Sequence, residues 1–191
     1  MKIAFIGTHG VGKTTLCYDL AASLKRRDVS VELVREVARD CPLPINRETT
    51  VRAQAWILHT QIAWELQAEE KAEAVVCDRA VIDNFCYLRR AATGDPAEKV
   101  LEALVKAWMP TYGLLVKVPV VSDPRFDGVR DTDVSFQHEI DEMLGEVLRA
   151  WGVPYLALDP ARRDDWTRIV LEAAVPVLRP QELLFPETEP G

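Results

Sequence analysis

Residues 2–15 read KIAFIGTHGVGKTT and combine two different signals. Lys2–Ile6 is a short and mostly apolar run of the kind that forms a buried strand. The residues that follow, Gly7-Thr8-His9-Gly10-Val11-Gly12-Lys13-Thr14-Thr15, fit the pattern G-x-x-x-x-G-K-[ST] and open a helical period. Glycines let the backbone curl so that N–H groups point inward at phosphate oxygens, and the helix N-terminus adds partial positive charge. The stretch therefore predicts a phosphate-binding loop.

The residues at the end of the loop indicate which kind of phosphate-containing ligand it binds. Lys13 has the length to reach the β- and γ-phosphates, and the Thr14 hydroxyl is suited to ligate Mg²⁺. We therefore expect a nucleoside triphosphate, with ATP as the default, together with Mg²⁺. His9 has no role of its own in this interpretation. The alternative is a glycine turn that matches the pattern by chance.

Outward from the loop, apolar runs alternate with helical periods, which predicts an α/β fold around a parallel sheet. We expect five strands, at 2–6, 31–35, 74–77, 113–118 and 153–158. The expected helices cover 13–27, 48–72, 81–92, 98–108, 136–151 and 166–177. The result is a three-layer P-loop fold with the first strand central, as one domain over residues 1–180. Residues 181–191, rich in Pro and Glu, are expected to form a flexible tail.

Composition narrows the class of protein. With 191 residues, 48% of them hydrophobic, the chain suits one globular domain and excludes disorder and coiled coil. No apolar run approaches the roughly 18–20 residues of a membrane span, so we expect a cytoplasmic protein without a membrane partner. The net charge of -7 argues against nucleic acid as a partner. Four cysteines without C-x-x-C spacing are predicted to be reduced.

Three absences narrow the choice among proteins that carry such a loop. The sequence has no N-K-x-D motif after a strand, which argues against a GTPase. The third expected strand ends in Cys77-Asp78-Arg79 and lacks the Asp-Glu pair of motor-type ATPases. A second domain of the kind that oligomeric AAA machines append is also missing from these residues.

Four further segments carry a family resemblance. They are Glu36-Val37-Ala38-Arg39, the helix with Gln61 and Glu65, Asp78-Arg79, and Asp127-Gly128-Val129-Arg130. With the glycine loop, and over roughly residues 1–160, the chain resembles the nucleoside and nucleotide kinases among P-loop proteins. Within them it is most similar to ribosylnicotinamide-kinase-like domains, a group also classed as AAA-type ATP-binding domains.

The resemblance implies roles for the charged residues at strand ends, where α/β sheets bind their ligands. Asp78 would hold Mg²⁺ through water, beside Thr14. Glu36 would accept the proton of the attacking hydroxyl or fix the acceptor's ribose. Arg79 and Arg39 would grip the acceptor or the transferring phosphoryl group. Surface ion pairs, Glu36 with Arg39 and Asp78 with Arg79, are the alternative.

Two longer segments complete the expected site. Residues 122–134 would form a lid, in which Arg130 contacts the triphosphate with Arg125 behind it, unless the segment is only a solvated charged loop. Residues 36–73 would bind the acceptor. Within them Gln54, Gln61 and Glu65 share one helix face, which either lines the acceptor pocket or faces solvent. We expect Gln61 to contact the acceptor.

The sequence thus predicts a Mg·ATP-dependent phosphotransferase that acts on a small nucleoside- or nucleotide-like acceptor. Ala80 stands where thymidylate and deoxynucleoside kinases usually carry Ser, Tyr or Trp, which leaves the acceptor open. One alternative is a regulatory ATPase or switch whose output is a partner protein. Another is a kinase of nucleic-acid 5′ ends, which needs a basic patch such as Arg26, Arg27, Arg89 and Arg90 together. An oligomer is compatible with the sequence.

Overall fold

The computed structural model describes residues 1–92, 94–121 and 134–179. In these residues the strands are β1 Lys2–Ile6, β2 Val31–Val34, β3 Ala74–Asp78, β4 Tyr112–Lys117 and β5 Leu156–Ala157. The α-helices are α1 Lys13–Lys25, α2 Val51–Glu69, α3 Val81–Ala92, α4 Ala97–Trp108, α5 Val134–Trp151 and α6 Trp166–Leu178. Short 3₁₀ turns, η1 Val37–Asp40, η2 Asn46–Glu48, η3 Met109–Thr111 and η4 Pro160–Asp165, lie between them.

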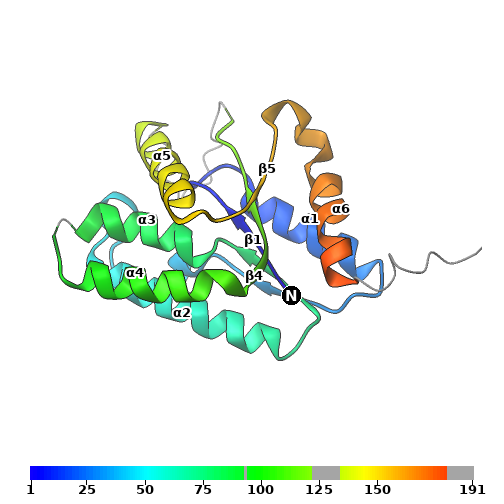
Figure 1. Cartoon of the computed structure of the whole chain (residues 1–191), viewed down its shortest axis with the longest axis horizontal. Coiled ribbons are helices and arrows are strands. Elements are labelled where there is room, and N and C mark those ends of the chain that lie inside the picture. The colour runs from blue at the N-terminus through cyan, green and yellow to red at the C-terminus, as the bar shows by residue number, and fades with distance from the viewer. Residues whose placement is uncertain (93, 122–133, 180–191) are drawn as a thin grey trace, which may run out of the picture.

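The elements form three layers, with the sheet in the middle (Figure 1). All strands are parallel and follow the order β2-β3-β1-β4-β5, so β1 is central as predicted. Successive side chains of a strand point to opposite faces. Ala4 and Ile6 therefore pack with the helices α2 to α5, whereas Ile3 and Phe5 pack with α1 and α6. The predicted three-layer α/β fold is confirmed.

The last strand differs most from its prediction. Sequence patterning predicts a strand over 153–158, but only Leu156–Ala157 pairs with β4, opposite Val116 and Lys117. Pro154 lies in the expected segment and has no N–H to donate to a neighbouring strand. The helix expected from 48 begins at Val51, where the Thr50 hydroxyl accepts the Ala53 N–H at 3.2 Å. Most of the expected lid and the whole of the tail at 181–191 lie outside the described residues.

The described residues also bear on membrane spans and on the state of the cysteines. None of their helices is long and apolar enough to cross a membrane. All four cysteines are unpaired, as predicted, and Cys17, Cys77 and Cys86 are buried.

The sheet order defines where a ligand can bind. Strands β2 and β3 lie on one side of β1, and β4 and β5 lie on the other side. Ligands of open parallel sheets bind beyond the carboxyl ends of the strands, at the point where the order reverses. In this chain that point is the end of β1, from which the glycine loop begins.

Candidate active site

The glycine loop adopts conformations that its sequence requires. Gly7 has a φ of +141°, and a Cβ atom there would lie 2.7 Å from the Val118 carbonyl oxygen. Gly12, at the start of α1, has a φ of +94°. Both positions lie in a region that favours glycine, and Gly7 has no room for a side chain as well. The loop therefore turns tightly around the end of β1.

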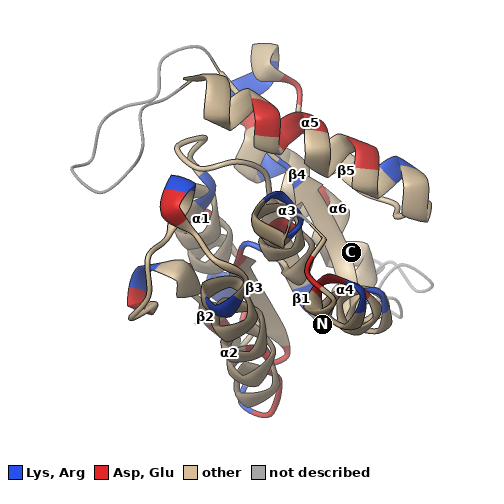
Figure 2. Cartoon of the chain, turned by 90° about the vertical axis from the view of Figure 1, so that its left-hand side faces the viewer, with Lys and Arg blue, Asp and Glu red and all other residues tan. Residues whose placement is uncertain are grey.

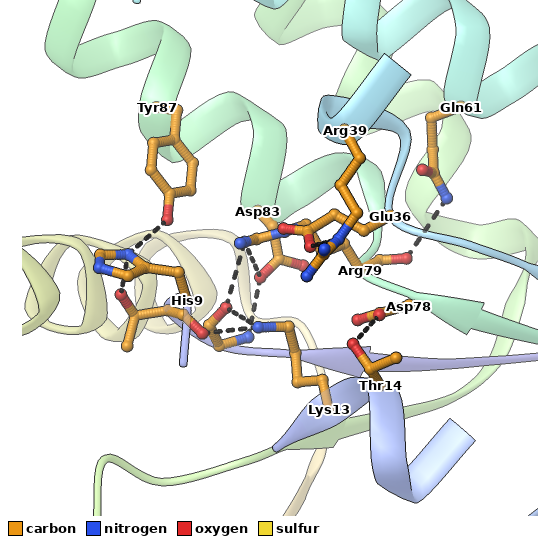
Figure 3. A network of polar contacts seen from close by, with 12 residues as sticks. His9, Lys13, Thr14, Glu36, Arg39, Gln61, Asp78, Arg79, Asp83 and Tyr87 are labelled. Atoms are coloured by element: carbon orange, nitrogen blue, oxygen red, sulfur yellow. Dashed lines mark hydrogen bonds and ion pairs between the residues drawn. The ribbon is translucent and has the colours of Figure 1, made fainter. Parts of the chain in front are cut away.

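Lys13 lies inside this turn and is 5% exposed. Its Nζ donates hydrogen bonds to the carbonyl oxygens of Gly7 at 2.9 Å and Thr8 at 2.6 Å (Figure 3). Burial and then the positive charge of Arg79 lower the pKa of Lys13 to about 8, although nearby carboxylates oppose the shift. The ammonium is thus held at the centre of the loop at neutral pH.

Nucleotide affinity should fall above pH 8 because of this lowered pKa. Above that pH the free protein loses the Lys13 charge, whereas a bound triphosphate favours the charged form. Each binding event then takes up a proton, and the Kd should rise by up to about tenfold per pH unit. Calorimetric titration of ATP at pH 7.5–9.5 measures this, in two buffers that differ in ionisation enthalpy. In Lys13→Arg the side chain stays charged, so equal pH dependence in that variant would contradict the assignment.

Thr14 and Asp78 form the second part of the site. The Thr14 hydroxyl donates to the Asp78 carboxylate at 2.5 Å, at the point where β3 ends beside β1. No cluster of three or more metal-ligating side chains occurs in the described ranges. Proteins that bind Mg²⁺ together with a nucleotide usually hold it through one or two protein oxygens, and phosphates and water complete the coordination. The hydroxyl and the carboxylate are hard oxygen ligands, so the residues present fit the ion.

Glu36 lies between two arginines. In the register of β2 and β3, Val34 stands opposite Cys77, which brings Glu36 level with Arg79. Arg79 Nε donates to Glu36 Oε1 at 2.8 Å, and Arg39 Nε donates to Glu36 Oε2 at 3.0 Å. Burial alone would raise the pKa of Glu36, but Arg79, Lys13 and Arg39 outweigh it and hold the pKa well below its usual range. Glu36 is therefore a stable carboxylate that accepts hydrogen bonds.

Asp83 is a buried polar residue that the sequence patterns did not identify. Its Oδ1 accepts the Gly7 N–H at 2.8 Å and its Oδ2 accepts the Ala80 N–H at 2.9 Å. Burial raises the pKa of Asp83, against the opposing charges of Arg79 and Lys13. The residue caps the first turn of α3 and ties the glycine loop to it. The capping-box pattern would not have revealed it, because that pattern has Ser or Thr at the N-cap and Glu or Gln three residues later, whereas this helix begins with Ala80 and Asp83 in those places.

Removal of the Asp83 carboxylate should destabilise the protein. Asp83→Ala leaves the N–H groups of Gly7 and Ala80 buried without acceptors, and the expected loss is about 2–5 kcal/mol. Asp83→Asn keeps one acceptor oxygen and should lose less. Urea unfolding of both variants measures the difference. An Asp83→Ala variant as stable as the parent would show that the two bonds contribute nothing.

A small cavity lies beside these residues. Its walls include Glu36, Arg39 and Arg79 together with His9, Gln54, Ile57, Asn84 and Tyr87. It encloses about 40 Å³, which is room for a few water molecules. Tyr87, which its helical spacing marks as a core residue, is buried and still forms part of the cavity wall. Its hydroxyl lies 3.4 Å from His9 Nδ1, which joins α3 to the glycine loop.

The remaining predicted residues lie in different places. Gln61 is buried, but its amide bonds to Glu65 and to the Arg79 carbonyl, away from the cavity wall. The face shared by Gln54, Gln61 and Glu65 is therefore buried and does not face solvent. Arg125 and Arg130 lie outside the described residues. Trp64 and Phe85, two aromatic residues of α2 and α3, contact Arg35 and Trp151 respectively and are not part of the cavity wall.

A larger groove of about 960 Å³ lies elsewhere on the molecule. It is lined mainly by apolar side chains from the start of β4 and the end of α5, and among the described residues of its wall only Lys106 is charged. The start of β4 is the end of the sheet opposite to the glycine loop. We place the candidate active site at the smaller cavity, because only that one adjoins the phosphate-binding residues.

Comparison with known proteins bears on the fold. Residues 2–165 match the model of a family described as an AAA domain. The chain also superimposes on deoxyadenosine kinase from M. mycoides, with a TM-score of 0.65 for the structure with bound dATP and 0.64 for that with the products dCMP and dCDP. In both, the identity is 14% and the match covers 92% of this chain and 99% of that chain. A sequence search of curated proteins finds no match. The structural likeness confirms the predicted P-loop kinase fold.

Proposed function

We propose that this chain, which belongs to the AAA domain family, is a kinase that transfers the γ-phosphoryl group of ATP to a small nucleoside- or nucleotide-like acceptor. The predicted resemblance to P-loop nucleoside and nucleotide kinases is confirmed at the level of the fold. The single observation that carries the proposal is the cavity next to the glycine loop, in whose wall Glu36 lies between Arg39 and Arg79. Motor ATPases and switches need no such second pocket next to the phosphates.

The donor side follows from the loop geometry. Backbone N–H groups of residues 7–15 and the N-terminus of α1 would hold the phosphates, and Lys13 would neutralise charge that develops on the γ-phosphoryl group. Thr14 and Asp78 would hold Mg²⁺, and the ion would offset the negative charge of the phosphates. Lys13 stays positively charged in a buried position, where a charge acts more strongly than in water.

The acceptor side follows from the Glu36 pair. We place the acceptor hydroxyl at the Glu36 carboxylate, which would orient it toward the γ-phosphoryl group by accepting its hydrogen bond. Arg79 and Arg39 would contact the acceptor or the transferring group through their planar guanidiniums. Phosphoryl transfer passes through a loose transition state, so positioning and charge contribute more than proton removal. A carboxylate with a lowered pKa is sufficient for that role.

Acceptor binding requires movement, because about 40 Å³ is too small for a nucleoside. Arg39, half-exposed on the 3₁₀ turn η1, is the wall residue that we expect to swing outward. We keep the lid at 122–134 in the proposal, with Arg130 on the triphosphate and Arg125 behind it. The lid would exclude water, so that the phosphoryl group reaches the acceptor.

Two features support a small acceptor in a reducing compartment. Acidic and basic residues are interspersed along the ribbon in Figure 2. Within the expected basic patch, Arg90 pairs with the Glu139 carboxylate at 2.9 Å, and Arg26 and Arg27 bond to Ser23 at the end of α1. A nucleic acid needs basic residues clustered along a groove. The unpaired cysteines suit the cytoplasm. The resemblance to ribosylnicotinamide-kinase-like domains that the sequence motifs predict makes nicotinamide riboside one acceptor to test.

An acceptor screen tests the proposal. The purified protein with Mg·ATP is incubated with separate pools of nucleosides, nucleoside monophosphates, nicotinamide riboside and 5′-hydroxyl oligonucleotides, and mass spectrometry detects one added phosphoryl group. We expect a single small product. ADP release without any phosphorylated acceptor would favour the regulatory ATPase, and a phosphorylated oligonucleotide would favour the 5′-end kinase.

A further inference from the structure

Arg79 combines an uncommon backbone conformation with a buried side chain. Its φ is +94°, a region that residues other than glycine rarely adopt, and the side chain is 6% exposed. Residues in such conformations carry a cost of about 1–3 kcal/mol and persist only where their surroundings hold them. The Arg79 N–H donates to the Phe5 carbonyl at 3.1 Å, which fixes one side of this peptide.

Gln61 holds the other side. Its Nε2 donates to the Arg79 carbonyl at 3.3 Å (Figure 3). The same nitrogen donates to Glu65 Oε1 at 2.8 Å. Both neighbours are acceptors, so only the amide nitrogen can face them, and the orientation of the amide is determined. The Gln61 Oε1 atom is buried without a hydrogen-bond partner among the described residues. An apolar side chain would avoid that cost, so the amide is retained for its bonds.

Glu65 is the anchor of this arrangement. It is fully buried, and besides Gln61 it accepts the Tyr112 hydroxyl at 2.7 Å, the Trp108 indole N–H at 2.7 Å and the Lys2 ammonium at 3.2 Å. These partners come from β4, α4 and β1, so the carboxylate is fixed from three elements at once. Lys2 also lies 4.4 Å from the centre of the Trp108 ring. The network ends at the Arg79 carbonyl and includes none of the residues that line the cavity except Arg79 itself.

We propose that Gln61 is a positioning residue: held by Glu65, it keeps Arg79 in its left-handed conformation and thereby aims the guanidinium at Glu36. The catalytic consequence rests on the proposed kinase function, whereas the geometric part stands without it. Gln61 acts on the acceptor site through Arg79 and makes no contact with the acceptor.

The first experiment uses no substrate. In protein labelled with ¹⁵N-arginine, the Arg79 Nε–H resonance, assigned by its loss in Arg79→Lys, should exchange slowly because it donates to Glu36 at 2.8 Å. Gln61→Met should accelerate that exchange by about tenfold, the effect of one lost hydrogen bond. Gln67→Met, on the exposed face of α2, is the matched control and should change nothing. If Gln61→Met does not fold, Gln61→Asn takes its place in the experiment. Its amide is too short to reach the Arg79 carbonyl, so the exchange of the Arg79 Nε–H should accelerate to the same extent.

Exchange within twofold of the parent in a folded Gln61 variant would overturn the proposal. The second experiment is a double-mutant cycle on acceptor turnover. Gln61→Met should lower kcat/KM by about tenfold in the parent and by less than twofold in Arg79→Lys, with the KM for ATP unchanged. Equal losses in both backgrounds would mean that Gln61 acts independently of Arg79. If the parent phosphorylates no acceptor, the kinase proposal fails, and the exchange experiment alone decides the positioning role.

Discussion

Lys13→Ala is expected to reduce phosphoryl transfer by about a thousandfold or more, because the loop then has no cation beside the transferring group. The measurement is the rate of acceptor phosphorylation at saturating Mg·ATP. Lys25→Ala, an exposed lysine at the end of the same helix, is the matched control and should keep the full rate. A Lys13→Ala variant with unchanged turnover would remove the loop from the mechanism.

The same substitution should leave the fold intact. At pH 7 Lys13 is charged in both the folded and the unfolded chain, so the native state bears the whole burial penalty of the ammonium. A pKa lowered from 10.5 to about 8 corresponds to about 3 kcal/mol. The buried stem of the lysine contributes about 2 kcal/mol in the opposite direction. The unfolding free energy of Lys13→Ala should therefore lie within about 1 kcal/mol of the parent, so that loss of activity reports on chemistry.

Asp78→Asn is expected to raise the Mg²⁺ concentration needed for half-maximal rate and to lower the maximal rate by about a hundredfold. The amide has no negative charge, and Mg²⁺ prefers carboxylate and hydroxyl oxygens. Asp78 is 4% exposed and bonds to Thr14, so the substitution changes charge at nearly constant shape. A Mg²⁺ titration of the transfer rate at fixed ATP measures both effects.

Thr14 provides the control for this assignment. Thr14→Ser keeps the hydroxyl and should retain most of the rate, whereas Thr14→Val removes it at similar volume and should resemble Asp78→Asn. If Thr14→Val and Asp78→Asn both kept the Mg²⁺ dependence of the parent, the ion would be held elsewhere.

The fold was predictable because the local sequence patterns specify the same strands and helices that the parallel sheet requires. Five apolar runs separated by helical periods specify a parallel sheet, and the structure has the strands within a few residues of the expected positions. The exception is the last strand, where an apolar run contains Pro154 and only two residues pair. Edge strands have one neighbour, so their length depends on that neighbour more than on their own sequence.

The site was predictable in part, for a geometric reason. The loop Gly7–Thr15 follows β1, Asp78 is the last residue of β3, and Glu36 lies two residues after β2. The ends of these strands meet at one edge of the sheet. Gln61 was assigned to the acceptor because it shares a helix face with Gln54, yet seven residues of helix place it about 10 Å farther along. Asp83 was missed because its partner Gly7 is distant in sequence. Neither contact can be read from spacing alone.

The left-handed backbone at Arg79 has a consequence for the engineering of this protein. Glycine at that position would remove a backbone cost of about 1–3 kcal/mol. It would also leave the mostly buried Glu36 carboxylate without its partner at 2.8 Å, and loss of one partner from a buried ion pair costs about 3–5 kcal/mol. Stabilisation programmes that replace residues of positive φ by glycine should therefore leave position 79 unchanged, because the side chain contributes more to the fold than its backbone conformation costs.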